Sequence, residues 1–188
     1  MPRSPSDIVV GQAWFKRFRR KANDFFYWED VAKQGEITEI WTEAMKGFHE
    51  NKGYKVRCRG TDPGELSGID ITVFDKNNSE AQIAIELQHW WPDTLNKDLP
   101  KLACSNAPLK ILMTKLRDDE DMENLKNKVL DIWQKRSDRV KNDELLMLLA
   151  ITKSNIGEGT YTYVRVEGYL SKHSQGWIKL KSRILYEK

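Results

Sequence analysis

The chain has 188 residues, of which 39% are hydrophobic and 31% are charged, and its formal net charge is +3. These proportions exclude a disordered chain, and the apolar run of about 20 residues that a membrane-spanning helix needs is missing. No signal peptide is recognisable, and two cysteines are too few for a disulfide framework. We therefore expect a cytoplasmic protein with free thiols, no membrane partner and one domain over residues 1–188.

Residues 1–35 are predicted to form an amphipathic or irregular arm that is rich in aromatic and basic residues. We expect its aromatic side chains to be buried against the main domain, because large apolar rings are costly in water. Basic residues interleaved with aromatic ones suit a nucleic-acid backbone, although a solvated helix face has the same pattern. The candidate nucleic-acid-binding residues of this arm are Lys16, Arg17, Arg19, Arg20 and Lys21.

Residues 36–51 are predicted to form a helix, because their apolar side chains recur with the helical period. The stretch YKVRCR that follows is predicted to be a strand, and its Lys55 and Arg57 join the candidate nucleic-acid-binding residues. After a loop dense in Gly and Pro, residues 69–74 and 81–87 form a predicted hairpin around a polar turn.

The rest of the chain alternates predicted helices and strands. In the short helix predicted over residues 92–105, Pro100 indicates a start, a kink or a break, because proline lacks a backbone N–H. An apolar strand, a helix with one apolar face, a buried strand and a closing pair of strands follow over residues 109–114, 118–140, 145–154, 160–170 and 176–187. This order predicts an α/β fold with a mixed central sheet flanked by helices.

Two carboxylates stand within the apolar strands of the predicted hairpin, where neutral residues would be less costly. Side chains alternate across a strand, so aligning the apolar faces of the two strands brings Asp70, Glu86 and Gln88 to the opposite face. Two close carboxylates repel each other, and one of them protonates unless a cation lies between them. A hard divalent cation such as Mg²⁺ resolves this conflict, although a polar face that meets solvent or a basic helix also fits the pattern.

The predicted helix over residues 36–51 adds further carboxylates. Glu39 and Glu43 are one helical turn apart and can face the same way. If the helix packs on the sheet, one of them could reach the carboxylate pair. Both residues are equally compatible with ordinary surface glutamates.

The order of these features resembles the PD-(D/E)xK nuclease superfamily, the restriction-endonuclease-like proteins. The resemblance rests on the helix leading into GY, the lone Asp of GID within an apolar strand, and the Glu of AIELQ near the end of the next strand. A helix and the strand LKILMT follow, so the resemblance covers residues 36–115. It implies a restriction-endonuclease-like core, with residues 116–188 adding a helix and extra C-terminal strands that complete the sheet.

The resemblance also implies which residues form a site. In the family, the Asp, the Glu and the carbonyl of the residue after the Glu bind the metal, and these features correspond to Asp70, Glu86 and Leu87 in this chain. The first-helix glutamate of the family corresponds best to Glu43. All of these assignments are carried over from the family, residue by residue.

One position departs from the family pattern. Its lysine, which orients the attacking water and stabilises charge on the phosphate, is replaced here by Gln88. Glutamine is uncharged but can hold a water by hydrogen bonds. In some members the lysine comes from the following helix instead, where Lys101 fits slightly better than Lys97.

These expectations favour a DNA endonuclease that depends on Mg²⁺, or on Mn²⁺ in its place. Gln88 motivates an alternative, a catalytically inactive nucleic-acid-binding or accessory protein on the same fold. A protein-interaction domain without a nucleic-acid role is a further alternative. A homodimer is an arrangement that the resemblance also suggests, since cutting both strands of a duplex takes two sites.

Overall fold

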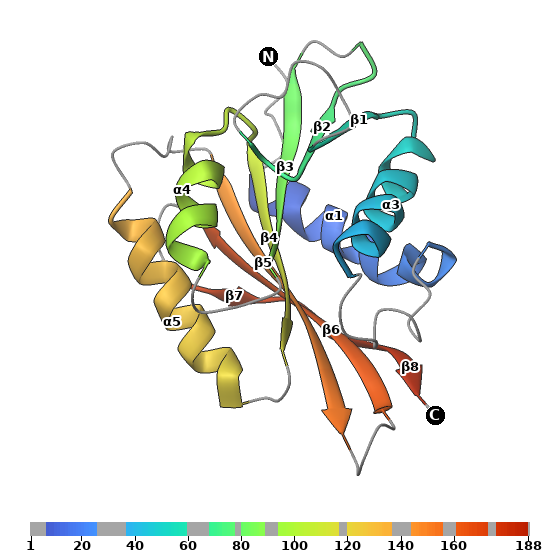
Figure 1. Ribbon diagram of the computed structural model, residues 1–188, viewed down its shortest axis with the longest axis vertical. Coiled ribbons are helices and arrows are strands. Elements are labelled where there is room, and N and C mark those ends of the chain that lie inside the picture. Colours follow the sequence, from blue (N-terminus) through green and yellow to red (C-terminus); the bar gives the residue numbers. More distant parts are fainter. Residues whose placement is uncertain are drawn as a thin grey trace.

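A computed structural model describes residues 7–25, 37–59, 68–77, 80–88, 94–116, 120–136, 144–155, 161–172 and 176–187. Within these residues the protein has an α/β fold with an eight-stranded mixed sheet and four α-helices (Figure 1). The elements are α1 (Asp7–Lys21), the 3₁₀ helix η1 (Ala22–Asp24), α3 (Ile37–Glu50), β1 (Lys55–Cys58), β2 (Ile71–Phe74), β3 (Ala81–Gln88), α4 (Leu95–Cys104), β4 (Leu109–Leu116), α5 (Glu120–Gln134), β5 (Leu145–Asn155), β6 (Tyr161–Lys172), β7 (Ile178–Lys179) and β8 (Arg183–Glu187).

The sheet has the strand order β1-β2-β3-β4-β5-β6-β7, and β8 also pairs with β6. The pairs β3–β4 and β4–β5 are parallel, and the other pairs are antiparallel. Helices α4 and α5 connect the parallel strands. Right-handed crossovers between strands that advance in one direction place their helices on the same face of a sheet, and both helices share one face here (Figure 1).

Each face of the sheet carries its own hydrophobic core. Helices α1 and α3 cover one face, where Trp41 and Phe48 pack with strand residues such as Ile85. Helices α4 and α5 cover the other face, where Leu99 and Leu125 pack with a different set of strand residues. Figure 1 shows the two pairs of helices on opposite sides of the sheet. Because both faces are covered, β4 is buried along nearly its whole length and β5 is buried from Leu145 to Ile151, and most of these buried side chains are apolar, as is typical of parallel strands.

The prediction that the aromatic side chains of the N-terminal arm are buried is confirmed for Trp14, Phe15 and Phe18. These side chains belong to the core under α1 and α3. A Cβ atom at Gly168 of β6 would lie 2.5 Å from the Phe15 ring, so this glycine permits α1 to pack closely on the sheet. The aromatic residues at positions 26–28 lie outside the described residues.

A buried hydrogen-bonded histidine joins α1 to α3. The Trp14 indole donates its N–H to Nε2 of His49 at 3.1 Å, and His49 Nδ1 lies 2.8 Å from the Met45 carbonyl oxygen. Since an indole N–H only donates, Nδ1 must carry the proton and donate to the carbonyl. Burial lowers the pKa of His49 to about 4, so the ring is neutral at neutral pH and serves to hold the two helices together.

Most predicted elements are confirmed, and three boundaries are corrected. The helix around Pro100 continues from Leu95 to Cys104, because the buried leucines of α4 compensate for the hydrogen bond that proline cannot donate. The predicted helix 118–140 ends at Gln134 and is followed by a turn. The predicted strand 176–187 is divided into β7 and β8, which pair with different parts of β6 and are separated by the buried Leu180.

Neither Cys58, which is buried, nor Cys104, which is exposed, forms a disulfide bond, as predicted. No helix in the described part of the chain combines the length and the apolar character that crossing a membrane requires. The division into an arm, a core and a C-terminal part is not tested by this architecture and stays a prediction.

Candidate active site

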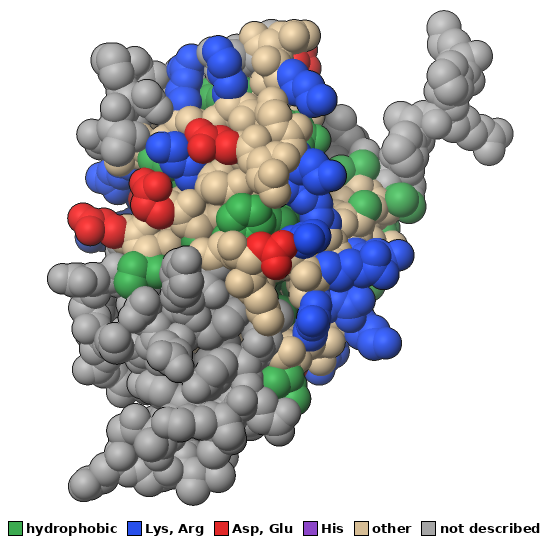
Figure 2. All heavy atoms as spheres, turned by 90° about the vertical axis from the view of Figure 1, so that its right-hand side faces the viewer, with side chains coloured by type: hydrophobic (Ala, Val, Ile, Leu, Met, Phe, Trp, Pro, Cys, Tyr) green, Lys and Arg blue, Asp and Glu red, His purple; other side chains and the backbone are tan. Residues whose placement is uncertain are grey.

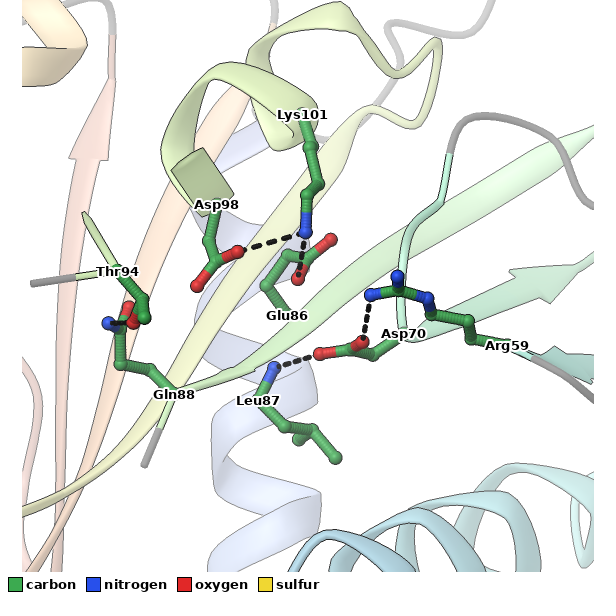
Figure 3. Close-up of polar contacts among 8 residues, drawn as sticks. All are labelled: Arg59, Asp70, Glu86, Leu87, Gln88, Thr94, Asp98 and Lys101. Carbon is green, nitrogen blue, oxygen red and sulfur yellow. Dashed lines mark hydrogen bonds and ion pairs between the residues drawn. The ribbon is translucent and has the colours of Figure 1, made fainter. Parts of the chain in front are cut away.

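The pairing of β2 with β3 brings the two carboxylates of the hairpin together. Ile71 lies opposite Ile85, so the preceding residue Asp70 meets the following residue Glu86. The two isoleucines belong to the core under α1 and α3. Because side chains alternate, Asp70, Glu86 and Gln88 lie on the face that carries α4, which is the convergence that the alternation predicted (Figure 3).

Asp70 is held by the backbone and approached by a cation. The Leu87 backbone N–H donates to Asp70 Oδ2 at 2.9 Å. The Arg59 guanidinium nitrogen Nη1 lies 3.8 Å from Asp70 Oδ1, and the Arg59 side chain is 57% exposed. Such an exposed and distant ion pair adds little stability. Arg59 is therefore available to contact another negatively charged group beside the site.

Lys101 of α4 reaches over the sheet to the carboxylates. Its Nζ lies 3.6 Å from Glu86 Oε2 and 2.9 Å from Asp98 Oδ1 (Figure 3). Sequence reasoning did not single out Asp98 as a site residue. The signal that could have found it is its spacing, because residues three apart share one face of a helix.

Glu86 is buried where a carboxylate is least stable. Two causes raise the pKa of Glu86 to about 9: burial is the larger, and the negative charge of Asp70 is the second. The positive charge of Lys101 opposes this shift. At neutral pH Glu86 is therefore protonated in the absence of an additional cation. Its Oε1 is buried and has no hydrogen-bond partner among the described residues.

Lys101 remains a cation in this environment. Burial lowers its pKa, but the hydrogen bond to Asp98 and the charges of Glu86 and Asp98 outweigh burial and raise the pKa above the usual value for lysine. A lysine that is 30% exposed on its side chain and held by Asp98 presents a fixed positive charge. This charge lies at the mouth of a buried acidic pair.

The donor set fits a hard divalent cation. Asp70 and Glu86 supply oxygen ligands, and the Glu86 oxygen without a partner is a buried acceptor that a cation would satisfy. A cation there would also return Glu86 to its ionised form, because opposite charge stabilises a carboxylate. Among the described residues no group of three or more His, Cys, Asp or Glu side chains forms a metal site, so further ligands would come from backbone, water or substrate.

Gln88 is buried and directed away from the carboxylates. Its Nε2 donates to Thr94 Oγ1, and Figure 3 shows the side chain turned toward Thr94 rather than toward Glu86. Its Oε1 has no hydrogen-bond partner among the described residues, and the same holds for Oγ1 of Thr114, which lies opposite it on β4. Two such buried acceptors side by side can hold a water molecule.

The other candidate residues divide between the two faces. Lys55 and Arg57 lie on β1, on the face that carries Asp70. Glu43 is exposed on α3, which packs against the opposite face, and its role as a site residue stays a prediction.

The basic residues of α1 also lie on the α3 side of the sheet. Figure 2, which looks onto that side, shows Lys and Arg side chains gathered along one edge of the molecule. Arg17 donates to the Phe48 carbonyl oxygen and lies 4.0 Å from the centre of its ring, while Lys16, Arg20 and Lys21 are exposed. The structure thus separates these cations from the carboxylate pair by the thickness of the sheet.

No protein-family model matches the chain, and no curated protein matches it. Among solved structures, the chain is similar to a carbon-nitrogen hydrolase from Helicobacter pylori G27, with a TM-score of 0.34 and 12% sequence identity over 89% of this chain and 70% of that chain. It is also similar to the central domain of yeast acetyl-CoA carboxylase, with a TM-score of 0.37 and 14% identity over 78% of this chain and 26% of that chain. These similarities are too low to carry an argument about function.

Proposed function

We propose that the protein is a metal-dependent DNA endonuclease that hydrolyses phosphodiester bonds. The observation that carries the proposal is the buried pair Asp70 and Glu86, in which Glu86 has an oxygen without a partner and a pKa raised to about 9. An acidic pair that is unstable by itself but stable around a divalent cation is typical of a functional site.

The proposal assigns a role to each residue. Asp70, Glu86 and the backbone of Leu87 would hold Mg²⁺ or Mn²⁺. When bound, the ion would supply positive charge next to the scissile phosphate and lower the pKa of a water molecule. Lys101, fixed by Asp98, stabilises negative charge on the phosphate through its ammonium group.

Gln88 acts on water in this proposal. Thr94 fixes its amide nitrogen, which leaves the amide oxygen to accept a hydrogen bond from a water molecule. A neutral amide orients water without removing its proton. Gln88 is therefore a positioning residue in this scheme.

The order of the elements supports the same proposal. A helix, an antiparallel three-strand meander, a second helix and a parallel strand follow one another as α3, β1, β2, β3, α4 and β4. This is the order on which the resemblance to the PD-(D/E)xK superfamily rests. On β1 the exposed Lys55 and the half-buried Arg57 offer contacts for a phosphate backbone on the same face as the carboxylates.

A second candidate function rests on Gln88. The position that carries a lysine in the family holds an uncharged side chain, and that side chain is turned toward Thr94. A protein with this fold that binds nucleic acid without cleaving it would keep the basic strand β1 and would not hydrolyse phosphodiester bonds.

Calorimetry and cleavage assays separate the two candidates. Mg²⁺ and Mn²⁺ are titrated into the wild type and into the Asp70→Asn/Glu86→Gln variant, and both proteins are incubated with supercoiled plasmid and with single-stranded DNA. We expect binding of the ion and cleavage by the wild type, and neither by the variant. Cleavage that survives in the variant contradicts the endonuclease assignment, whereas DNA binding by a wild type that never cleaves supports the second candidate.

A further inference from the structure

The pairing of β1, β2 and β3 arranges the residues on the α4 side of the sheet in rows. Each row crosses the strands and contains a cation from β1 or from the residue after it, a residue from β2 or from the position before it, and a residue from β3, all on the same face. The backbone N–H of Arg59 donates to the Asp70 carbonyl oxygen at 2.9 Å, which extends the ladder to the site. The rows are Arg59, Asp70 and Glu86, then Arg57, Thr72 and Ala84, then Lys55, Phe74 and Ala81.

A pocket occupies the second and third rows, directly beside the row that holds the carboxylates. Its volume is about 620 Å³, and Thr72, Ala84 and Phe74 line it from the sheet. The segment between α4 and β4 also lines the pocket, through Ser105 and Asn106. The volume lies within the range of about 300–1,000 Å³ that is common for small-molecule sites.

The chemistry of the pocket suits a flat ring with polar edges. Its lining is mainly apolar, and Gln82 and Asn106 add amide groups to it. Amides can pair with the donors and acceptors on a nucleobase edge, and apolar or aromatic surfaces stack on its face. Glu80 lines the pocket too and is exposed, so a phosphate is repelled from that part of it.

The cations that suit phosphate lie along β1, outside the pocket lining. The Arg57 guanidinium lies 4.8 Å from the centre of the Phe74 ring, which lines the pocket. Lys55 is exposed at the start of β1, and Arg59 is exposed directly after its end. Residues two apart along a strand are about 6.7 Å apart, so the three cations form a regular line that leads to the carboxylates.

We propose that this pocket binds the base of an unpaired nucleotide in single-stranded DNA, next to the phosphate that lies at Asp70 and Glu86. The inference rests on the proposed function and extends it. It names the substrate as DNA with an unpaired segment at the site of cleavage. Phosphates of the strand follow Arg57 and Lys55, and the base turns into the pocket. A paired base in a duplex is stacked between its neighbours and cannot enter without being extruded.

The test measures DNA binding in EDTA, where cleavage and metal binding play no part. Fluorescence anisotropy compares a short labelled single-stranded oligodeoxythymidine with a blunt duplex that contains the same sequence. Asn106→Trp places a large side chain in the pocket from an exposed position of the turn. The matched control is Asn127→Trp, an exposed asparagine on α5.

We expect the wild type to prefer the single strand, and Asn106→Trp to weaken single-strand binding by about tenfold, as for the loss of one stacked base. Duplex binding should be unchanged in this variant, and Asn127→Trp should bind both probes like the wild type. Arg57→Gln should lower the salt dependence of single-strand binding by about 0.7 in slope, the contribution of one phosphate contact.

Equal binding of both probes by the wild type, or single-strand binding that Asn106→Trp leaves unchanged, overturns the inference. Both results are independent of catalysis. A protein that cleaves plasmid with Mg²⁺ but fails this test keeps the proposed function and loses the pocket assignment. A protein that passes this test but neither binds the metal ions nor cleaves DNA keeps the pocket and loses the proposed function.

Discussion

Two lysine–glutamate pairs on the same side of the sheet have opposite characters. Nζ of Lys110 on β4 lies 2.5 Å from Oε2 of Glu144, and the two side chains are 0% and 3% exposed. Lys110 also lies 3.4 Å from the Ala103 carbonyl oxygen and 5.7 Å from the centre of the Trp133 ring. In contrast, Nζ of Lys101 lies 3.6 Å from Oε2 of Glu86, and the Lys101 side chain is 30% exposed.

Under the proposed function, the difference separates a structural pair from a pair at the active site. A buried ion pair of good geometry that is fully enclosed ties its elements together, here α4, β4 and the start of β5. Glu86 has a looser partner that it shares with Asp98, a second carboxylate beside it, and an oxygen without a hydrogen bond. Such an arrangement lowers the stability of the fold, and residues of this kind cluster where chemistry is done.

The largest expected effect is a loss of DNA cleavage when Glu86, of the pair with Lys101, is changed. Glu86→Gln keeps the shape of the side chain and removes its charge, so we expect ion binding to be lost and cleavage to fall by at least about a thousandfold. Cleavage of plasmid and single-stranded DNA with Mg²⁺ measures the effect. Thermal unfolding serves as the control, and a variant that is at least as stable as the wild type shows that the loss is not due to unfolding.

The second prediction concerns stability, for which the larger effect is expected in the pair of Lys110 and Glu144. Lys110→Met leaves Glu144 buried without its cation, so we expect the free energy of unfolding to fall by about 3–5 kcal/mol. Lys101→Met, the same change in the other pair, should alter it by less than about 1 kcal/mol, since Lys101 is partly exposed. Urea unfolding of both variants measures the difference. Equal losses would contradict the distinction between the two pairs.

The third prediction concerns pH. The pKa of Glu86 is raised from 4.5 to about 9 in the folded protein, so the folded state binds a proton that the unfolded state releases between these values. The stabilising contribution is present below pH 4.5 and is lost as pH rises through about 9. Without divalent ions, unfolding free energy should fall by roughly 3 kcal/mol between about pH 4.5 and about pH 7.

Urea unfolding at several pH values measures this dependence. Glu86→Gln cannot titrate and should remove it, and added Mg²⁺ should offset it in the wild type by binding the ionised form. An unchanged pH dependence in Glu86→Gln would mean that another group causes it. The buried His49 acts in the opposite direction at lower pH, because its depressed pKa of about 4 makes stability fall as pH drops below 6.5.

The smallest expected effect concerns the residue that holds Lys101. Asp98→Asn removes the charge that fixes the ammonium group, so we expect cleavage to fall by about tenfold. The pKa of Lys101 should also decrease, which moves the alkaline limit of the pH–rate profile to lower pH. Asp131→Asn, in the exposed pair with Lys135, is the matched control and should change neither. A lower rate with an unmoved alkaline limit would contradict the positioning role of Asp98.

Some features of the site could be predicted from the sequence because they are local. Alternation along the hairpin strands was sufficient to place Asp70, Glu86 and Gln88 on one face, since a one-residue slip would have exposed the isoleucines. The helical period likewise predicted α3 and the apolar face of α5. Lys101 was named as a candidate, but its distance to Glu86 could not be derived, because α4 and β3 meet only in the folded chain.

Other features had no local signal. Lys110 stands in an apolar strand, and its partner Glu144 is 34 residues away, so the ion pair depends on the parallel pairing of β4 with β5. The spacing of Asp98 and Lys101 shows that they share a face of α4, but the position of that face above the carboxylate pair depends on how α4 packs on the sheet. Lys55 and Arg57 were named from the sequence as candidate nucleic-acid-binding residues, but their place beside a pocket could not be derived.

The sequence by itself determined which residues share a face of each helix or strand, because that depends only on the period of the backbone. It therefore determined that Asp70, Glu86 and Gln88 lie together on the face of the hairpin opposite its apolar residues. Only the tertiary structure decided that α4 covers this face with Lys101 and Asp98, while α1 and α3 cover the other. The physical reason is that contacts between elements depend on long-range packing and crossover direction, which the local period does not contain.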